Sequence, residues 1–493
     1  MRVIKIEIQD FRGFHGNHVI ELAKVGERGK QNLLVYGENG SGKSSLLLAL
    51  KYLLESSLGD IDFSLHQNIF NSSENSGYVE ISLREMINTP ITLYRWSTVA
   101  TTTANQELRE ASKAKGILDY KSLLEVHFIH RDSASLNIFD LLIKTLLAGC
   151  INDIDTETPK RTFYQQWNDL LTIVPRRKNN VRQISIFEEK SRIFNEGLSA
   201  KLNELQSEIS VLMSYFSYPL DISFGFNCIR FDETAKYSNT APESSIANRE
   251  VSLHVKFFNQ ELSRPHHFLN EAKLSAIAIT IYLSSLLVAP KPRLKFLILD
   301  DIFIGLDMSN RLPLIDILKE KFRDYQIFLM TYDKEWYEIL KRHFSDWKMI
   351  EFYAEKCIDY EVPVLVENEK HLDKAKFYLQ NHDYKAAAIY LRTAFEAKIK
   401  WFCEKKNIAV KYREKSKDLK ADDFWTPVKN AKDSSGKKYI DAALAFDVDL
   451  YRSLIMNPLS HAQITTTPAQ EIQNAIDTVE RLEQTLNAIV NPS

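Results

Sequence analysis

Residues 33–50 read LLVYGENGSGKSSLLLAL, and this stretch decides the fold. Its first four residues predict a buried strand, and the leucine-rich run after Lys43 predicts a helix. Between them, residues 37–44 match the pattern G-x-x-x-x-G-K-[ST] in the strand–loop–helix context that a phosphate-binding loop requires. Glycines let successive backbone N–H groups turn toward phosphate oxygens, and the helix N-terminus adds partial positive charge. The stretch therefore predicts a nucleotide-binding loop, with an ordinary glycine-rich turn as the alternative.

A second motif, FLILDD at residues 296–301, ends an apolar run in two carboxylates. In phosphoryl-transfer sites such an acid holds Mg²⁺, and a neighbouring group orients the attacking water. We therefore expect Ser44 and Asp300 to bind Mg²⁺ and Asp301 to orient water; the alternative is that both acids only cap the strand. Lys43 is expected to reach the β- and γ-phosphates of ATP and to assist catalysis. The loop residues expected to contact the nucleotide are Gly37, Asn39, Gly40, Ser41, Gly42, Lys43, Ser44 and Ser45.

Length, charge and cysteine usage narrow the class of protein. A chain of 493 residues suffices for roughly two to four domains, and a net charge of −2 implies no whole-chain attraction to nucleic acid. The four cysteines lie far apart, which fits a reducing compartment and argues against a disulfide framework or structural zinc. The start, MRVIKIEIQDF, lacks a signal-peptide pattern, and no uninterrupted apolar run is long enough to span a bilayer. We expect a cytoplasmic protein without a membrane segment.

Residues 1–116 are expected to form the N-terminal lobe of an ATPase head. Alternating apolar residues at 3–22 predict a two-stranded hairpin around the turn Phe11-Arg12-Gly13-Phe14. Further strands are expected at 78–83 and 91–96. Arg12 lies just upstream of the phosphate loop and is expected to reach the nucleotide; the alternative is a solvated turn arginine.

Residues 117–217 are expected to form an inserted arm, a short antiparallel helical hairpin. The segment 136–147 is amphipathic, and apolar residues between 194 and 216 recur at steps of four and three, like a heptad seam. The alternative for that seam is an ordinary core helix. A basic tip at Arg176, Arg177 and Lys178 is either a solvated turn or a contact to DNA phosphates without sequence preference.

Residues 218–365 are expected to form the C-terminal lobe of the head. Strand patterns at 219–230 and 251–258 precede an apolar helix at 268–289. After FLILDD, a helix at 312–322 and a buried strand at 326–330 follow. This alternation of strands and helices after a phosphate loop predicts a mainly parallel sheet, and therefore an α/β fold.

The order of these motifs resembles the ABC-type ATPase heads of the SMC/Rad50/RecF class. The resemblance covers roughly residues 1–355 and implies that LNEAK at 269–273 stands where that class has its signature motif. In the class, the signature contacts the γ-phosphate bound to a second subunit, so that two heads sandwich two ATP molecules. The resemblance thus implies a homodimer or higher oligomer, with Asn270, Glu271 and Asp307 contacting the partner's nucleotide.

Several residues depart from the pattern of that class. Asn270 replaces the signature Ser, Asp301 replaces the usual Glu, and Tyr332 stands at the place of the switch His, where a catalytic role is implied. The class also has a glutamine near the metal, for which Gln67 is a weak candidate. These departures suit slow, gated hydrolysis, and the short arm argues against bridging of chromosomes.

Residues 366–493 are expected to form an all-α domain. The segment DYKAAAIYLRTAFEAKI at 383–399 and Asn457-Pro458-Leu459-Ser460-His461 resemble HEPN-like helical domains. Active HEPN ribonucleases have an arginine close before the polar residue; here Met456 is at that place and Arg452 lies too far upstream. His461 is therefore either an acid–base group acting on RNA or a packing residue in an oligomerisation domain.

A head with a short arm and such a tail is similar to the ATPase components of bacterial anti-phage systems, of which the Septu type works beside a separate HNH nuclease. The resemblance implies an ATP-binding, slowly hydrolysing sensor or scaffold that recruits a nuclease effector. The alternatives are an ATP-gated HEPN ribonuclease toxin and a RecF-like DNA repair ATPase. The cofactors expected in each case are ATP and Mg²⁺.

Overall fold

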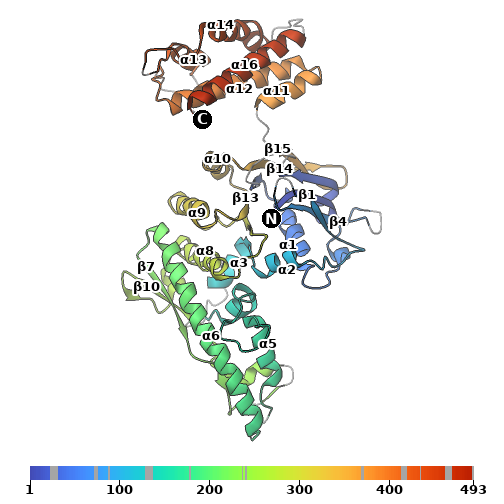
Figure 1. Cartoon of the computed structure of the whole chain (residues 1–493), viewed down its shortest axis with the longest axis vertical. Coiled ribbons are helices and arrows are strands. Elements are labelled where there is room, and N and C mark those ends of the chain that lie inside the picture. The colour runs from blue at the N-terminus through green and yellow to red at the C-terminus, as the bar shows by residue number, and fades with distance from the viewer. Residues whose placement is uncertain are drawn as a thin grey trace. The chain divides into compact units, whose positions relative to one another are not determined.

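The computed structural model describes the whole chain except residues 23–31, 72–75, 87–88, 128–136, 177–178, 236, 239–240, 368–370, 412, 414–418, 434, 461–468 and 491–493. The chain divides into two compact units, Met1–Glu367 and Asn368–Ser493. Figure 1 labels the main elements of each unit.

A six-stranded sheet forms the centre of the first unit, in the order β15-β14-β3-β13-β12-β6. The strands are β3 (Leu33–Gly37), β6 (Ile117–Asp119), β12 (Phe296–Asp300), β13 (Gln326–Thr331), β14 (Lys348–Lys356) and β15 (Glu361–Glu367). All neighbours run parallel except β14 and β15. This confirms the predicted mainly parallel sheet. Because parallel strands end at the same edge, the carboxyl ends of β3, β6, β12 and β13 lie together.

Alternating residues of β3 enter two different hydrophobic cores. Leu33 and Val35 pack with α1 (Lys43–Glu55), whose leucines face the same cluster. Leu34 and Tyr36 pack with helices on the opposite face of the sheet. Successive side chains of a strand point to opposite faces, so the apolar run that precedes the phosphate loop is explained by a strand covered on both sides.

A second, antiparallel sheet packs with α1 in the order β2-β1-β4-β5. Its strands are β1 (Arg2–Phe11), β2 (Phe14–Glu21), β4 (Tyr78–Arg84) and β5 (Thr92–Ser97). The pairing of β1 with β2 confirms the predicted hairpin, and Arg12 in its turn has a left-handed φ of 49°. The 3-10 helix η1 (Phe63–His66) and α2 (Gln106–Lys113) complete this part of the unit.

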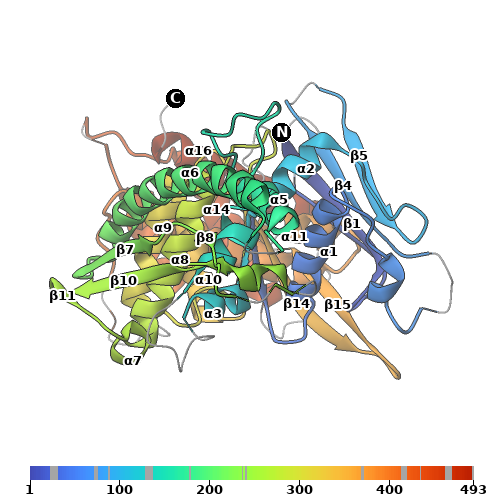
Figure 2. The ribbon, with the colours of Figure 1, turned by 90° about the horizontal axis from the view of Figure 1, so that it is seen from below.

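Beyond residue 119, the regular elements described within 117–217 are helices. Its helices are α3 (Tyr120–His127), α4 (Phe139–Leu141), the π-helix η2 (Leu142–Leu146), α5 (Phe163–Ile173), α6 (Val181–Met213) and the 3-10 helix η3 (Ser214–Phe216). Residues 174–180 join α5 to α6, which pack against each other, and α6 also lies over α8 (Glu271–Val288) (Figure 2). Residues 117–119 belong to the central sheet, which differs from the prediction of a helical arm from residue 117 onward. The apolar residues of α6 enter the same core as α8, as the alternative of an ordinary core helix expects.

The remaining elements of the first unit are short strands and helices from residue 220 onward. They are β7 (Leu220–Phe226), β8 (Arg230–Phe231), the 3-10 helix η4 (Pro242–Ser245), β9 (Ile246–Ala247), β10 (Val251–Phe257), β11 (Gln260–Glu261), α7 (Pro265–Phe268), α9 (Met308–Lys321) and α10 (Lys334–His343). Strands β11, β10 and β7 form one small antiparallel sheet, and β8 pairs with β9.

Among the described residues, α8 is the one helix that is long and apolar enough to cross a membrane by length and composition. Its apolar run is interrupted by Glu271, Lys273 and several Ser and Thr residues. In the structure 78% of that helix is buried inside the protein, as in a core helix. Its apolar side chains thus fill the larger core of the first unit.

The described residues of the second unit form helices around a core of their own. The helices are α11 (His371–Gln380), α12 (Tyr384–Lys405), α13 (Ala421–Asn430), α14 (Ala442–Tyr451), the π-helix η6 (Arg452–Met456), α15 (Asn457–Ser460) and α16 (Ala469–Val490). Trp425 and Phe395 stack edge to face at its centre, with ring centroids 5.6 Å apart.

Candidate nucleotide-binding site

The phosphate loop connects β3 to α1 at the carboxyl edge of the central sheet. Gly40 and Gly42 have left-handed φ values of 86° and 103°, which only glycine adopts without strain. Lys43 is buried, and its Nζ donates to the carbonyl oxygens of Gly37 at 2.6 Å and Glu38 at 3.2 Å. The lysine thus folds back over the loop, and its charge is held by the carbonyl oxygens of the loop.

Gly42 has a second constraint, because strand β15 packs directly against it. A Cβ atom at residue 42 would lie 2.9 Å from Cγ of Pro363. We expect Gly42→Ala to lower the free energy of unfolding by about 1–3 kcal/mol and to weaken ATP binding. Urea unfolding and isothermal titration calorimetry measure the two effects.

Gly59→Ala is the matched control, because a Cβ there meets nothing within 4 Å. Combining Gly42→Ala with Pro363→Ala, which removes the closest atom, should recover part of the lost stability. Equal stability of the Gly42→Ala and Gly59→Ala proteins would show that the loop does not need this glycine.

The two acids of FLILDD lie beside the end of the phosphate loop. Ser44 Oγ donates to Asp300 Oδ2 at 3.1 Å, and Lys43 Nζ lies 3.9 Å from Asp301 Oδ2. The other oxygen of Asp300, Oδ1, is buried and has no hydrogen-bond partner among the described residues. A carboxylate beside a hydroxyl, with one orphaned oxygen, fits Mg²⁺, which takes few protein ligands and fills the rest with water and phosphate oxygens.

The surroundings of Asp300 disfavour its charge while the metal is absent. Burial, and next the charge of Asp301, raise the pKa of Asp300 to about 6, although Lys43 and Ser44 act in the opposite direction. Burial also raises the pKa of Asp301, against the effect of Lys43. A divalent cation bound at this point would relieve the desolvation and repulsion of both groups.

The raised pKa predicts a pH-dependent stability. The folded protein retains a proton on Asp300 up to about pH 6, whereas the ordinary pKa is 3.8, so the contribution of this group to stability falls as the pH rises from about 4 to 6. Asp300→Asn should therefore raise the free energy of unfolding of the ligand-free protein near pH 7, by on the order of 2 kcal/mol, and change it little near pH 4. Urea unfolding at both pH values measures this, with the exposed Asp346→Asn as control. An equal effect of Asp300→Asn at both pH values would contradict it.

Asp301 is held in a fixed orientation by the end of β13. Its backbone has a left-handed φ of 53°, and its N–H donates to Met330 O at 3.1 Å. Its Oδ1 accepts a hydrogen bond from the backbone N–H of Tyr332 at 2.9 Å. Tyr332 thus contacts Asp301 through its main chain, while its side chain is 41% exposed. The catalytic role implied for Tyr332 stays a prediction.

The sequence analysis missed Asp119, which ends β6 directly opposite Asp300 in the sheet register. Its Oδ1 accepts hydrogen bonds from Ser122 N at 2.8 Å and Ser122 Oγ at 2.5 Å, and its charge contributes to the raised pKa of Asp300. The available signal was a short apolar run, Ile117-Leu118, ending in an acid. Gln67, the weak candidate for a residue near the metal, pairs with Phe11 and lines a cavity beside the phosphate loop, and its role stays a prediction.

That cavity, of about 600 Å³, lies beside the phosphate loop at Gly40 and Ser45. Arg12 and Gly13 from the β1–β2 turn line it together with Gln67, as do the aromatic residues His66 and Tyr360. The structure thus brings Arg12 to the loop, as the prediction of nucleotide contact requires. The aromatic lining suits the nucleoside end of a nucleotide.

The residues of the implied second-subunit contact lie at two exposed helix starts. Asn270 caps α8 by accepting from Lys273 N at 3.1 Å, and Asp307 caps α9 by accepting from Asn310 N at 3.1 Å. Glu271 accepts from the Tyr120 hydroxyl at 3.2 Å. Gly305, two residues before Asp307, packs on the start of α8, because a Cβ there would meet Ser275 Oγ and lie 3.5 Å from Glu271 Cγ. The segment that leads into α9 therefore lies against the start of α8.

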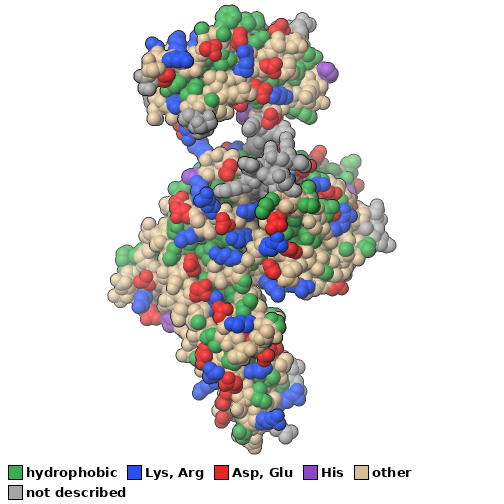
Figure 3. Space-filling model, in the orientation of Figure 1, with side chains coloured by type: hydrophobic (Ala, Val, Ile, Leu, Met, Phe, Trp, Pro, Cys, Tyr) green, Lys and Arg blue, Asp and Glu red, His purple; other side chains and the backbone are tan. Residues whose placement is uncertain are grey.

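The other predicted contact residues are only partly described. The guanidinium of Arg176 lies 5.8 Å from the ring centre of Tyr237, while Arg177, Lys178 and His461 lie outside the described residues. On the face shown in Figure 3, basic and acidic side chains are interspersed over the first unit. Arg452 is buried in the second unit, where it forms an ion pair with Asp422 at 2.6 Å. This contact gives the arginine a structural role.

Fold and loop geometry define a P-loop nucleotide-binding protein of the α/β class. The sequence profile of the RecF/RecN/SMC N terminal domain family matches residues 2–349, and the chain therefore belongs to this family. A comparison with curated protein sequences found no significant match.

Solved structures similar to the chain are SMC head domains. One is an Smc head bound to the C-winged helix domain of ScpA, with 13% identity, a TM-score of 0.43 and coverage of 75% of this chain and 99% of that one. Another is the Smc head domain with an extended coiled coil bound to the C-terminal domain of ScpA, derived from Pyrococcus furiosus. It has 15% identity and a TM-score of 0.42, and the match covers 77% of this chain and 99% of that one. A third is the SMC head domain from Thermotoga maritima, with 12% identity, a TM-score of 0.37 and coverage of 74% of this chain and 100% of that one.

Proposed function

We propose that this protein is a cytoplasmic ATPase that binds Mg²⁺ and ATP at the phosphate loop and hydrolyses ATP slowly. The observation that carries the proposal is the convergence of Ser44, Asp300 and Asp301 on the loop, where Asp300 Oδ1 has no hydrogen-bond partner among the residues that the structure describes. Bound Mg²⁺ would neutralise charge on the phosphate oxygens. Membership of the RecF/RecN/SMC N terminal domain family supports the same activity.

Each residue of the proposed ATP site has a role that follows from its position. Lys43 supplies a buried positive charge to the phosphates, and Ser44 and Asp300 offer oxygen ligands to the metal. Asp301, fixed by the N–H of Tyr332, is placed to accept a proton from or orient the attacking water. Arg12 and the cavity beside Ser45 receive the nucleoside.

Two copies of the chain are proposed to close on ATP through the surface formed by Asn270 and Asp307. Both residues are exposed and sit at helix N-termini, where partial positive charge favours an anion such as a γ-phosphate. Asn270 also retains an amide that can donate a hydrogen bond. The proposal therefore places the nucleotide of one copy against the α8 start of the other.

Asn270→Asp tests this arrangement without removing the helix cap. Asp caps a helix as well as Asn does, so the fold and ATP binding should persist, while the added charge should repel the γ-phosphate of the partner. We expect ATP to convert the wild-type protein and the conservative Asn270→Ser variant from monomer to dimer in light-scattering measurements, and to leave Asn270→Asp monomeric. If ATP does not change the association state of the wild-type protein, the proposal is wrong.

We further propose that the ATP-bound form recruits a separate nuclease in anti-phage defence. The order of motifs, with degenerate signature and switch positions, supports a gating role rather than rapid turnover. The test is co-purification with an HNH nuclease encoded beside this gene, in ATP and in ADP. RNA cleavage by the isolated chain would instead favour a self-contained ribonuclease.

A further inference from the structure

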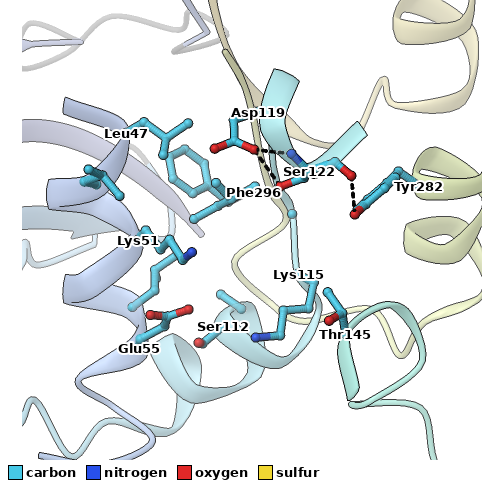
Figure 4. Close-up of a pocket in the computed structure, with 15 residues that line it drawn as sticks. Leu47, Lys51, Glu55, Ser112, Lys115, Asp119, Ser122, Thr145, Tyr282 and Phe296 are labelled. Atoms are coloured by element: carbon cyan, nitrogen blue, oxygen red, sulfur yellow. Dashed lines mark hydrogen bonds between the residues drawn. The ribbon is translucent and has the colours of Figure 1, made fainter. Parts of the chain in front are cut away.

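A second cavity, of about 270 Å³, lies away from the nucleoside side of the phosphate loop. It is formed between the second half of α1, the end of α2, β6, and Tyr282 of α8 (Figure 4). Its apolar wall consists of Leu47, Leu54 and Phe296, among others. The cavity is therefore large enough for a small organic molecule and has one side that would hold an apolar body.

Three polar groups of this cavity have unused hydrogen-bonding capacity. Ser112 is 6% exposed, and its Oγ is buried without a hydrogen-bond partner among the described residues. Lys51 and Lys115 line the same cavity, and within the described part of the chain neither ammonium group forms an ion pair. Lys115 is also held at a left-handed φ of 56°, which its side chain does not favour. A buried hydroxyl and two free ammonium groups at one cavity point to a ligand that accepts hydrogen bonds.

The two acids that line the cavity, Asp119 and Glu55, differ in the groups that they contact. Asp119 already accepts two hydrogen bonds from Ser122, at the far side of the cavity from Ser112 (Figure 4). Glu55 lies one helical turn after Lys51 and forms no ion pair among the described residues. The cavity thus offers Lys51, Lys115 and Ser112 to an anionic group, and the carboxylates of Glu55 and Asp119 to donor groups of the same ligand.

We infer that this cavity binds a small organic anion, a carboxylate or phosphate monoester with an apolar body. The anionic group would contact Lys51, Lys115 and Ser112, and the body would pack on Leu47 and Phe296. The cavity is distinct from the phosphate loop, although Asp119 lines it and also stands opposite Asp300 in the sheet. Both sites involve α1, which begins at Lys43 and carries Lys51 on its later turns. The inference does not depend on the proposed ATPase activity.

Phenyl phosphate and benzoate are suitable probes, with benzyl alcohol as the neutral analogue. Binding to the full chain is measured by saturation-transfer NMR, and the two anions distinguish a phosphate from a carboxylate preference. We expect Lys51→Met and Lys115→Met each to weaken the preferred anion about tenfold, because each removes a charge-assisted hydrogen bond. Lys113→Met, an exposed lysine at the same end of α2, should leave binding unchanged.

Circular dichroism and ADP binding of each variant show that the fold is intact. The inference fails if neither anion binds saturably, if benzyl alcohol binds as tightly as the anions, or if Lys113→Met weakens binding as much as Lys115→Met. It also fails if ADP displaces the probe, because the probe would then occupy the phosphate loop. A chain that binds the probe here but never binds ADP would contradict only the proposed function.

Discussion

Lys43→Ala is expected to lower the affinity for ATP about a hundredfold or more. The Lys43 ammonium is buried, donates to two carbonyl oxygens of the loop, and lies 3.9 Å from Asp301. In the ATP complex this charge would turn to the phosphates, and each charge-assisted hydrogen bond lost there costs about 1.5–3 kcal/mol. Isothermal titration calorimetry with ATP and Mg²⁺ measures the loss.

Lys113→Ala is the control, because Lys113 is exposed and stands outside the loop. Near-equal affinities of the Lys43→Ala and wild-type proteins would mean that residues 37–44 do not bind the phosphates. We expect Lys43→Arg not to restore the affinity, because the buried site of the lysine leaves little room for a guanidinium. Restored affinity would instead show that any cation suffices at this position.

Asp301→Asn is expected to leave ATP binding intact and to slow hydrolysis about 10²- to 10⁴-fold. The left-handed backbone at Asp301 tolerates Asn better than most residues, and the Asn side-chain oxygen can still accept from Tyr332 N–H. The variant therefore keeps the local structure and loses only the carboxylate that would act on water. Phosphate release and ATP affinity are measured on the same preparation.

Asp346→Asn, an exposed acid in the same unit, controls for a general effect of lost charge. If Asp301→Asn hydrolyses ATP at the wild-type rate, another group orients the water. Asp119 is then the first residue to test, because it ends the neighbouring strand β6.

The sequence predicted the parts of the site that are contiguous along the chain. The glycines, Lys43 and Ser44 stand in one loop, and Asp300 and Asp301 end one strand, so spacing alone was enough. The parallel sheet followed from the alternation of strands and helices. These features depend on local patterns that each segment carries by itself.

Features that arise from tertiary packing were not predictable in the same way. Asp119 joins the site because Leu118 and Asp119 pair with β12, some 180 residues later in the chain, and no local pattern encodes that pairing. The apolar seam of α6 fits both a coiled coil and a core helix, and only the position of α8 decides which residues it contacts. The raised pKa of Asp300 likewise depends on burial that the sequence does not show.

The packing of Pro363 beside Gly42 makes the phosphate loop depend on strand β15. This edge strand ends at Glu367, the last residue of the first unit. A side chain at residue 42 would have to push on the proline ring, whereas glycine leaves room for it. The glycine that the loop motif requires is therefore also the residue that lets an edge strand from a distant part of the chain close over the loop.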